Sequence, residues 1–182
     1  MTAFDDPVGT VRVPVLQGEA RVSADERVVF GTVLGSCVAS CLFDAVAGVG
    51  GMNHFLLAEP HAGHAAGEID VHYGVYLMEI LINEMISQGA SKSRIRAHLY
   101  GGANLHAGMM AIGTANADFA RSFLMHEHIQ LARADLGGNL ARRVDFRPAR
   151  GQVRCRLVAP GLAPQPVPIS RPPRANGDVE LF

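Results

Sequence analysis

Residues 37–57 have the sequence CVASCLFDAVAGVGGMNHFLL, in which two apolar runs are separated by the short segment DAVAG at 44–48. Each run has the length and the aliphatic content of a β-strand. The connection is short enough for a hairpin. The stretch therefore predicts two adjacent antiparallel strands and places a sheet in the first third of the chain.

Further elements are predicted on both sides of this hairpin. Valine-rich segments at 11–16 and 27–34 predict short strands. Apolar residues at helical spacing predict a helix that begins at the N-cap Asp70 and ends at Gly89. A second helix is expected from the N-cap Asn116 to about residue 128. Short strands are predicted at 95–100, 131–134, 143–146 and 153–158, with a turn at 137–139. This order predicts an α/β layered domain in which the helices cover sheet surfaces.

The last part of the chain differs in composition from the rest. Prolines stand at positions 160, 164, 166, 168, 172 and 173, and apolar periodicity is missing. Proline fixes φ and lacks a backbone donor, which favours extended chain. We therefore expect one folded domain at 1–159 and a proline-rich tail at 160–182.

Composition excludes several classes of protein. The chain has 182 residues with 16 basic and 17 acidic side chains, a balance that disfavours a nucleic-acid binder. Apolar runs fall short of the ~20 residues of a membrane span, and the first 20 residues lack the pattern of a secretory signal. Three cysteines, an odd number, argue against a disulfide framework. A cytoplasmic protein with reduced thiols and no membrane insertion is expected.

Cys37 is the first candidate for chemistry. It follows a glycine–serine turn at the start of an apolar strand. Gly35 permits close approach of another backbone beside the thiol, and the amides around the turn are candidates to stabilise an oxyanion. A small buried hydrophobic residue is the other role that free cysteine commonly fills. The residues by themselves leave both roles open.

His54 is the candidate base. It lies 17 residues after Cys37, on the second strand of the predicted hairpin. Cross-strand neighbours have Cβ atoms about 4.5–5.5 Å apart, so a contact between the two side chains is geometrically easy. An imidazole there would favour the thiolate and later protonate a leaving amine. A histidine that is merely hydrogen-bonded within the strand is the alternative.

Several motifs together resemble one known family. They are LGSCVA at 34–39, CLFD at 41–44, GMNH at 51–54, YGGA at 100–103, and DLGGN at 135–139 followed by ARRV at 141–144. In this order they are similar to the motifs of CheD, the chemoreceptor glutamine deamidases of bacterial chemotaxis. The resemblance covers most of the predicted domain, and the combination is more specific than any single motif.

The resemblance implies a fold and a catalytic set. The fold is an α/β/β/α-type sandwich related to deamidating bacterial toxins, and the activity is a protein-glutamine glutaminase, a hydrolase that uses a Cys-His-Thr set. By motif, Cys37 is the nucleophile, His54 the base and Thr32 the third member. In the family the threonine can stand one residue further from the cysteine, where this chain has Gly31. A one-residue shift reverses the face of a strand, so Thr32 joins the site only if the local geometry turns it toward His54.

The resemblance also implies surroundings and partners. Gly35 and Ser36 before the cysteine, with Gly101 and Gly102, form the expected substrate and oxyanion region. The substrate is a glutamine of a chemoreceptor cytoplasmic helix, and hydrolysis of methyl esters at such positions is a further possibility. No cofactor is required. A CheC-type phosphatase is a possible partner, and a non-catalytic module that binds it is the alternative function. The presence of both Cys37 and a candidate base favours the enzyme.

The histidine clusters and the glycine pairs do not predict a metal site or a nucleotide site. His61 and His64, with His72 nearby, and His126 with His128 lack persuasive metal-site spacing, so no metal is expected. The glycine pairs match neither a Walker sequence nor a dinucleotide fingerprint.

The remaining cysteines and arginines have simpler interpretations. Cys41 is expected in the core, and Cys155 is expected to be structural. Arginines at 142, 143, 154 and 156 predict a solvated sheet face, with contact to acidic receptor helices as the alternative.

Overall fold

The computed structural model of this chain describes residues 8–57, 69–105 and 112–159. The strands of this part are β1 (Val11–Pro14), β2 (Glu19–Ser23), β3 (Val28–Leu34), β4 (Val38–Asp44), β5 (Val49–Phe55), β6 (Arg96–Gly101), β7 (Gln130–Leu136), β8 (Arg142–Arg147) and β9 (Gln152–Leu157). The helices are α1 (Val71–Ser87) and α2 (Ile112–His126), with short 3-10 turns at Lys92–Arg94 and Pro148–Arg150. The predicted mixed α/β class is confirmed.

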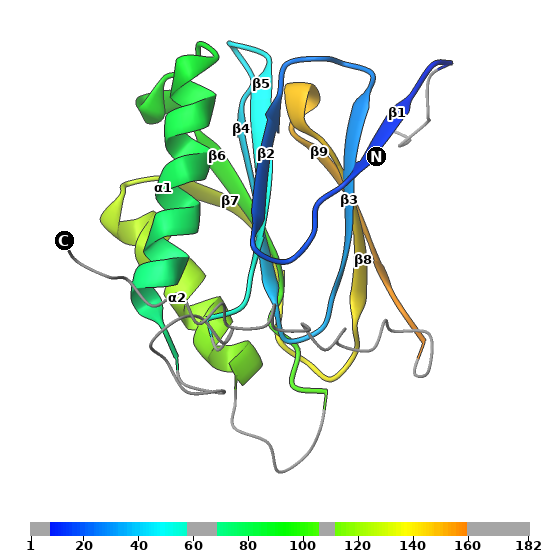
Figure 1. Cartoon of the computed structure of the whole chain (residues 1–182), viewed down its shortest axis with the longest axis vertical. Helices are drawn as coiled ribbons and strands as arrows, with labels where there is room; N and C mark the ends of the chain where they lie inside the picture. Colours follow the sequence, from blue (N-terminus) through cyan, green and yellow to red (C-terminus); the bar gives the residue numbers. More distant parts are fainter. Residues whose placement is uncertain (1–7, 58–68, 106–111, 160–182) are drawn as a thin grey trace, which may run out of the picture.

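The strands form two sheets that pack face to face (Figure 1). One sheet has the order β1-β3-β8-β9, and the other has the order β2-β5-β4-β6-β7. Both helices pack on the five-stranded sheet, α1 against β2 and β5, and α2 against β4, β6 and β7. The described residues thus form three layers, α/β/β. The second helical layer of the expected α/β/β/α sandwich is not found among them, so the outer face of the four-stranded sheet carries no described helix.

The central strands of the five-stranded sheet are buried on both faces. One core lies between this sheet and the helices, and a second core lies between the two sheets. Every residue of β5 is buried, and β4 is buried except for Phe43. Burial on both faces explains why these strands are continuous apolar runs instead of alternating ones. The predicted hairpin is confirmed, since β4 pairs antiparallel with β5 and Ala39 lies opposite His54.

The two helix starts had different outcomes. Asp70 caps α1 as predicted, since its carboxylate accepts the Tyr73 N–H at 3.1 Å, and Gly89 follows the helix end with φ +100°. The prediction that Asn116 caps the second helix was wrong. α2 begins at Ile112, and Asn116 is fully buried within it. Its side-chain amide contacts residues far away in the sequence, and such contacts cannot be predicted from the local sequence pattern.

Strand β2 was not predicted. It is a short edge strand whose residues are half-buried or exposed, and it pairs with β5. Residues 160–182, the predicted tail, lie outside the described residues, as do His61 and His64. No helix within the described ranges is long and apolar enough to cross a membrane.

Candidate active site

Cys37 lies in the loop between β3 and β4, at one end of the two sheets. The carbonyl oxygens of residues 35, 36 and 37 each accept a hydrogen bond, from the Ala103 N–H at 2.9 Å, the Asn116 side-chain amide at 2.8 Å and the Gly102 N–H at 2.7 Å, respectively. A trans peptide is planar, and its N–H points away from its carbonyl. Anchoring the Ser36 carbonyl therefore also fixes the direction of the Cys37 N–H, the backbone donor of the candidate nucleophile itself.

The glycine pair of the YGGA motif allows this close packing. Gly101 has φ +108°, and a Cβ there would collide with the Cys37 carbonyl oxygen. Gly102 has φ +65°, and its N–H is already bound to that carbonyl. Gly102 thus holds the cysteine loop and does not offer this N–H to an oxyanion. Gly35 and Ser36 lie in the loop itself, where a Cβ on Gly35 would meet the side chain of Leu105 at 2.8 Å.

His54 lies on β5 and faces the space between the sheets. Cys37 stands two residues before Ala39, the register partner of His54, which places the two site residues diagonally across the hairpin. The His54 Nδ1 lies 2.9 Å from the Thr32 Oγ1 and 3.3 Å from the Val15 carbonyl oxygen. A carbonyl can only accept, so we assign the ring proton to Nδ1. The lone pair is then on Nε2, which is buried and has no hydrogen-bond partner among the residues that the structure describes.

Burial also sets the protonation of this histidine. His54 is only 6% exposed, and burial lowers its pKa below the ordinary value of 6.5, an effect that the hydrogen bond to the Val15 carbonyl partly opposes. The imidazole is therefore neutral at neutral pH. A neutral imidazole with an unoccupied nitrogen is a proton acceptor.

Thr32 reaches the site through regular strand geometry. It lies on β3 between Phe30 and Leu34, which are both buried in the core between the sheets. Since alternate residues share a face, Thr32 faces the same core. The pairing of β3 with β8 is continuous from Phe30 to Leu34, so no bulge is needed. The structure brings Thr32 and His54 together, and Gly31 faces the opposite side of the sheet.

Sequence reasoning missed a segment that crosses the site, the turn at residues 16–19. The Glu19 N–H binds the Leu16 carbonyl at 3.0 Å, and Gly18 has φ +83°, the conformation that such a turn favours for glycine. The Gly18 N–H donates to the His54 carbonyl at 2.7 Å. At the turn, the Gln17 Oε1 lies 3.3 Å from the Cys37 Sγ. The Gln-Gly pair signals a turn, but its place beside Cys37 depends on the packing of the sheets.

The other two cysteines are poorly suited to nucleophilic chemistry. Cys41 is fully buried, and burial raises the pKa of its thiol. Burial and the nearby Asp135 raise the pKa of Cys155 to about 11. Only a thiolate is an effective nucleophile, so both side chains stay as inert thiols at neutral pH. Cys37 is half-buried and lies at the surface end of the sheets.

The described residues contain no group of three or more histidine, cysteine, aspartate or glutamate side chains that could hold a metal ion. His72, His126 and His128 belong to the described part and form no such group.

Comparison with known proteins identifies the family. The profile of the family described as "CheD chemotactic sensory transduction" matches residues 56–157. "Probable chemoreceptor glutamine deamidase CheD" of Caulobacter vibrioides is 50% identical over 188 residues, covering 100% of both chains. The protein of the same name from Zymomonas mobilis is 56% identical over 147 residues, covering 81% of this chain and 80% of its own. This protein belongs to the CheD family, as its motifs predicted.

Among solved structures, the hypothetical protein YfiH of Bacillus licheniformis aligns with a TM-score of 0.44 and 13% identity, over 66% of this chain and 49% of its own.

Proposed function

We propose that this protein is a chemoreceptor glutamine deamidase in which Cys37 is the nucleophile and His54 the general base. The observation that carries the proposal is the state of His54. Its Nδ1 is held by Thr32 and the Val15 carbonyl, while its buried Nε2 has no partner within the described part of the chain. An unsatisfied buried nitrogen costs free energy, and on a strand next to the cysteine loop such a nitrogen is a candidate for proton transfer.

The reaction follows from these groups. The His54 Nε2 accepts the Cys37 proton, and the thiolate attacks the side-chain carboxamide carbon of the substrate glutamine. The tetrahedral oxyanion takes a hydrogen bond from the Cys37 N–H, whose direction the anchored Ser36 carbonyl fixes. His54 returns the proton to the nitrogen as ammonia leaves and a thioester forms. Water, deprotonated by the same nitrogen, hydrolyses the thioester to glutamate and restores the thiol.

Gln17 supports this assignment of the substrate. Its carboxamide is the functional group of the proposed substrate, and the thiol already donates to its oxygen at 3.3 Å. The site thus accommodates a glutamine amide beside Cys37. Because Gln17 is exposed, an incoming glutamine can displace it.

Asn116 is a positioning residue in this proposal. Its Nδ2 donates to the Ser36 carbonyl at 2.8 Å, and its Oδ1 accepts the Leu57 N–H at 2.9 Å. One buried amide therefore ties the loop that carries Cys37 to the chain just beyond the strand that carries His54. Such support holds reacting groups within the small tolerance that catalysis requires.

The expected location and partners of this protein are those of a CheD family member. A chemoreceptor exposes its signalling helices in the cytoplasm, and we place this protein there. The chemistry above uses no cofactor. A CheC-type phosphatase is a partner that this proposal permits and does not require.

The test is deamidation of an unmodified chemoreceptor cytoplasmic fragment. The wild-type chain should release ammonia and add about 1 Da to the fragment for each glutamine that is hydrolysed. Cys37→Ala should abolish both signals, and Cys155→Ala, which removes another half-buried thiol, should retain them. Activity in Cys37→Ala would refute the nucleophile. A folded wild type that is inactive on several receptors but binds the phosphatase would instead favour the regulatory module.

A further inference from the structure

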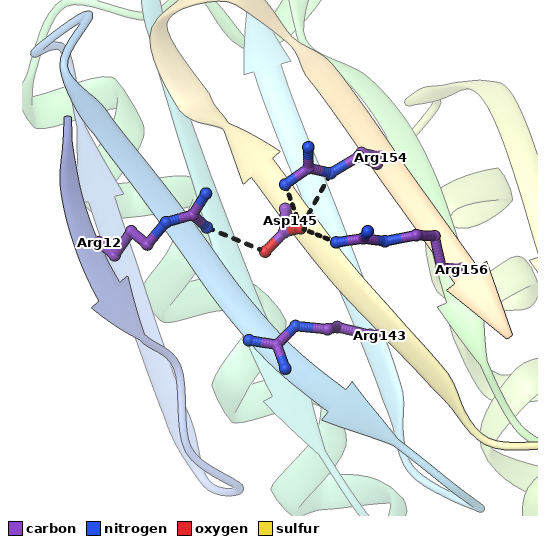
Figure 2. A pocket seen from close by; sticks show the side chains of 5 residues that line it. All are labelled: Arg12, Arg143, Asp145, Arg154 and Arg156. Atoms are coloured by element: carbon purple, nitrogen blue, oxygen red, sulfur yellow. Dashed lines mark hydrogen bonds and ion pairs between the residues drawn. The ribbon is translucent and has the colours of Figure 1, made fainter. Parts of the chain in front are cut away.

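The outer face of the four-stranded sheet carries a basic hollow. Its volume is about 430 Å³, and it is lined by Arg12 of β1, Arg143 and Asp145 of β8, and Arg154 and Arg156 of β9 (Figure 2). This is the face that no described helix covers. We call these five residues the arginine face.

The hollow results from the strand register. β3 lies between β1 and β8, and the residue that it places opposite Asp145 is Gly31. A Cβ on Gly31 would lie 3.7 Å from the Asp145 Oδ1, so a longer side chain would fill this space. The glycine thus leaves an open floor between the arginine of β1 and those of β8 and β9.

Positive charge exceeds negative charge in this hollow. Asp145 is 2% exposed and pairs with Arg12 at 3.3 Å, Arg154 at 2.9 Å and Arg156 at 3.5 Å. Four arginines around one carboxylate leave a local net charge of +3, although the whole chain has a net charge of −1. Arg143 forms no ion pair with any residue that the structure describes. The cluster therefore has an excess of oriented guanidinium donors that can bind anionic groups.

The arginine face extends across four strands, which suits a ligand that carries several negative charges. Arg12 and Arg156 stand on the first and last strands of a four-stranded sheet, which are about 14 Å apart at a spacing of roughly 4.8 Å per strand. Their guanidinium groups converge on the Asp145 carboxylate, at 3.3 Å and 3.5 Å, whereas Arg143 forms no ion pair with a described residue, so donors remain available along the face. Carboxylates three or four residues apart on a helix repeat every 5–6 Å, roughly, and can engage several of these arginines together.

The arginine face also lies within reach of Cys37. Arg143 is the register partner of Val33, and Cys37 follows Val33 by four residues. Four residues span at most about 14 Å and paired strands are about 5 Å apart, so Arg143 and Cys37 lie within about 19 Å, the length of a helix of roughly 13 residues. One helical segment can therefore contact Arg143 and present a glutamine at the thiol.

We propose that the arginine face binds the acidic side of a helical protein segment. On the proposed function, on which this identification rests, that segment belongs to the substrate. The face supplies specificity for acidic substrates, since it acts on binding and is not in contact with the reacting atoms. Each deamidation adds a carboxylate to the substrate and increases its complementarity to these arginines.

The experiment measures binding without turnover. A labelled chemoreceptor cytoplasmic fragment is titrated with the Cys37→Ala chain, alone or with Arg143→Glu added. Arg143 has no ion pair to lose with any described residue, so reversing its charge should leave the fold intact, which thermal unfolding checks. We expect Kd to rise about tenfold for Arg143→Glu and to change by less than about twofold for Arg143→Lys. Raising the salt from 50 to 500 mM should weaken binding by the chain that keeps Arg143 and have less effect on Arg143→Glu.

The matched control is Arg121→Glu, which makes the same charge change at an exposed position on α2. It should leave Kd unchanged. Equal losses of affinity in Arg121→Glu and Arg143→Glu would show that the effect comes from net charge alone, and would overturn the proposal. Unchanged binding in both Arg143→Glu and Arg156→Glu would also overturn it. Competition by inorganic phosphate at constant ionic strength, with no discrimination between acidic and neutral helical fragments, would show a small-anion site instead.

Activity separates this inference from the proposed function. In otherwise wild-type chain, Arg143→Glu should raise KM for the receptor fragment and leave kcat unchanged. A loss of kcat would contradict a role in binding alone. If the chain binds the fragment through Arg143 but releases no ammonia, the deamidase proposal fails while the acidic-helix surface stands.

Discussion

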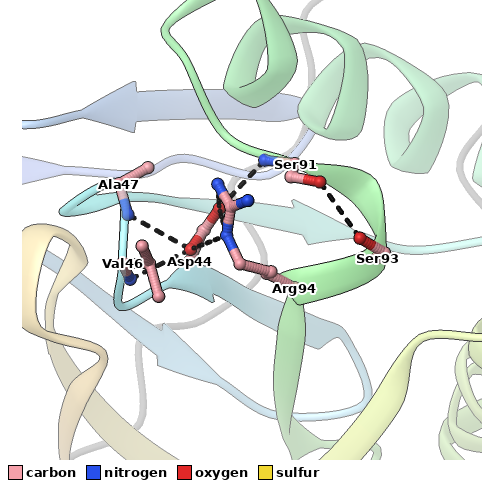
Figure 3. Close-up of polar contacts among 6 residues, drawn as sticks. All are labelled: Asp44, Val46, Ala47, Ser91, Ser93 and Arg94. Carbon is pink, nitrogen blue, oxygen red and sulfur yellow. Dashed lines mark hydrogen bonds and ion pairs between the residues drawn. The ribbon is translucent and has the colours of Figure 1, made fainter.

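The two ends of the β4–β5 hairpin differ in how completely their buried polar side chains are hydrogen-bonded. At the far end, the Asp44 carboxylate is fully buried and accepts bonds from the Val46, Ala47 and Ser91 N–H groups and from Arg94 (Figure 3). These hydrogen bonds hold the pKa of Asp44 at about 2 against the opposing effect of burial. Both carboxylate oxygens are occupied, so this end is a structural clamp between the hairpin and residues 91–94.

At the other end of the hairpin, one nitrogen of a buried side chain is left unsatisfied. The His54 Nδ1 is hydrogen-bonded, whereas the His54 Nε2 has no partner in the part of the chain that the structure describes. The Cys37 thiol nearby faces the neutral carboxamide of Gln17. The difference teaches that the completed hydrogen bonds of Asp44 stabilise the fold, while the open nitrogen of His54, on the strand next to the Cys37 loop, is available for chemistry. The following changes test that contrast.

The largest effect is expected from His54→Asn at the incomplete end. Asparagine can still donate an N–H toward the Val15 carbonyl but has no group in the place of Nε2. We expect kcat for deamidation to fall by about 10³-fold, within the range for loss of a general base, while thermal stability changes little. A kcat within about tenfold of wild type would show that the open nitrogen is not the base.

Removing the clamp at the complete end should affect stability and not chemistry. Asp44→Ala leaves buried donors unpaired and removes the partner of Arg94. We expect the free energy of unfolding, measured in urea, to fall by about 3 kcal/mol. The folded fraction should keep its kcat, and a large loss of kcat would mean that the two ends are coupled through the hairpin.

Asn116→Asp tests the link between the loop and the strand. The carboxylate can still accept the Leu57 N–H, but it cannot donate to the Ser36 carbonyl. We expect kcat to fall by about 10–30-fold with little change in KM, because the direction of the Cys37 N–H is no longer fixed. Asp44→Ala is the control for lost stability. If Asn116→Asp lowers stability as much as Asp44→Ala and leaves kcat intact, its role is structural alone.

The two ends should also respond to pH in different ranges. Because the pKa of His54 is lower in the folded chain, the unfolded chain takes up a proton at this residue more readily as the pH falls below about 6.5. The free energy of unfolding therefore decreases in this pH range. The lowered pKa of Asp44 makes a second loss between about pH 4 and pH 2. His54→Asn should reduce the first loss without removing it, because burial also lowers the pKa of His98. Asp44→Ala should reduce the second only, and urea titrations across this range measure both.

The smallest effect is expected at Gln17. Gln17→Ala uncovers the thiol and should speed alkylation of Cys37 by iodoacetamide about threefold. Gln17→Glu places a negative charge beside the sulfur and should slow it by disfavouring the thiolate. Cys37→Ala identifies the labelled site. Equal rates in all three forms at residue 17 would show that the contact between Gln17 and Cys37 does not persist in solution.

Local patterns in the sequence predicted much of this protein. The apolar runs at 37–57 indicated the hairpin, and Asp70 indicated the start of α1, because strand burial and helix capping depend on residues close together in the chain. The Gly-Ser-Cys turn and the histidine on the next strand indicated a candidate nucleophile and base. The motifs indicated the family.

Tertiary structure decided the rest. Thr32 meets His54 across 22 residues, and Asn116 meets Ser36 across 80, so neither contact follows from a local period. Both helices cover one sheet and leave the arginine face open, which depends on how strands from distant segments are ordered. The sequence by itself determined most of the strands, the start of α1 and which side chains can react, but not strand β2 or the start of α2. The packing of the two sheets determined which of those side chains meet, because that packing alone fixes distances between residues far apart in the chain.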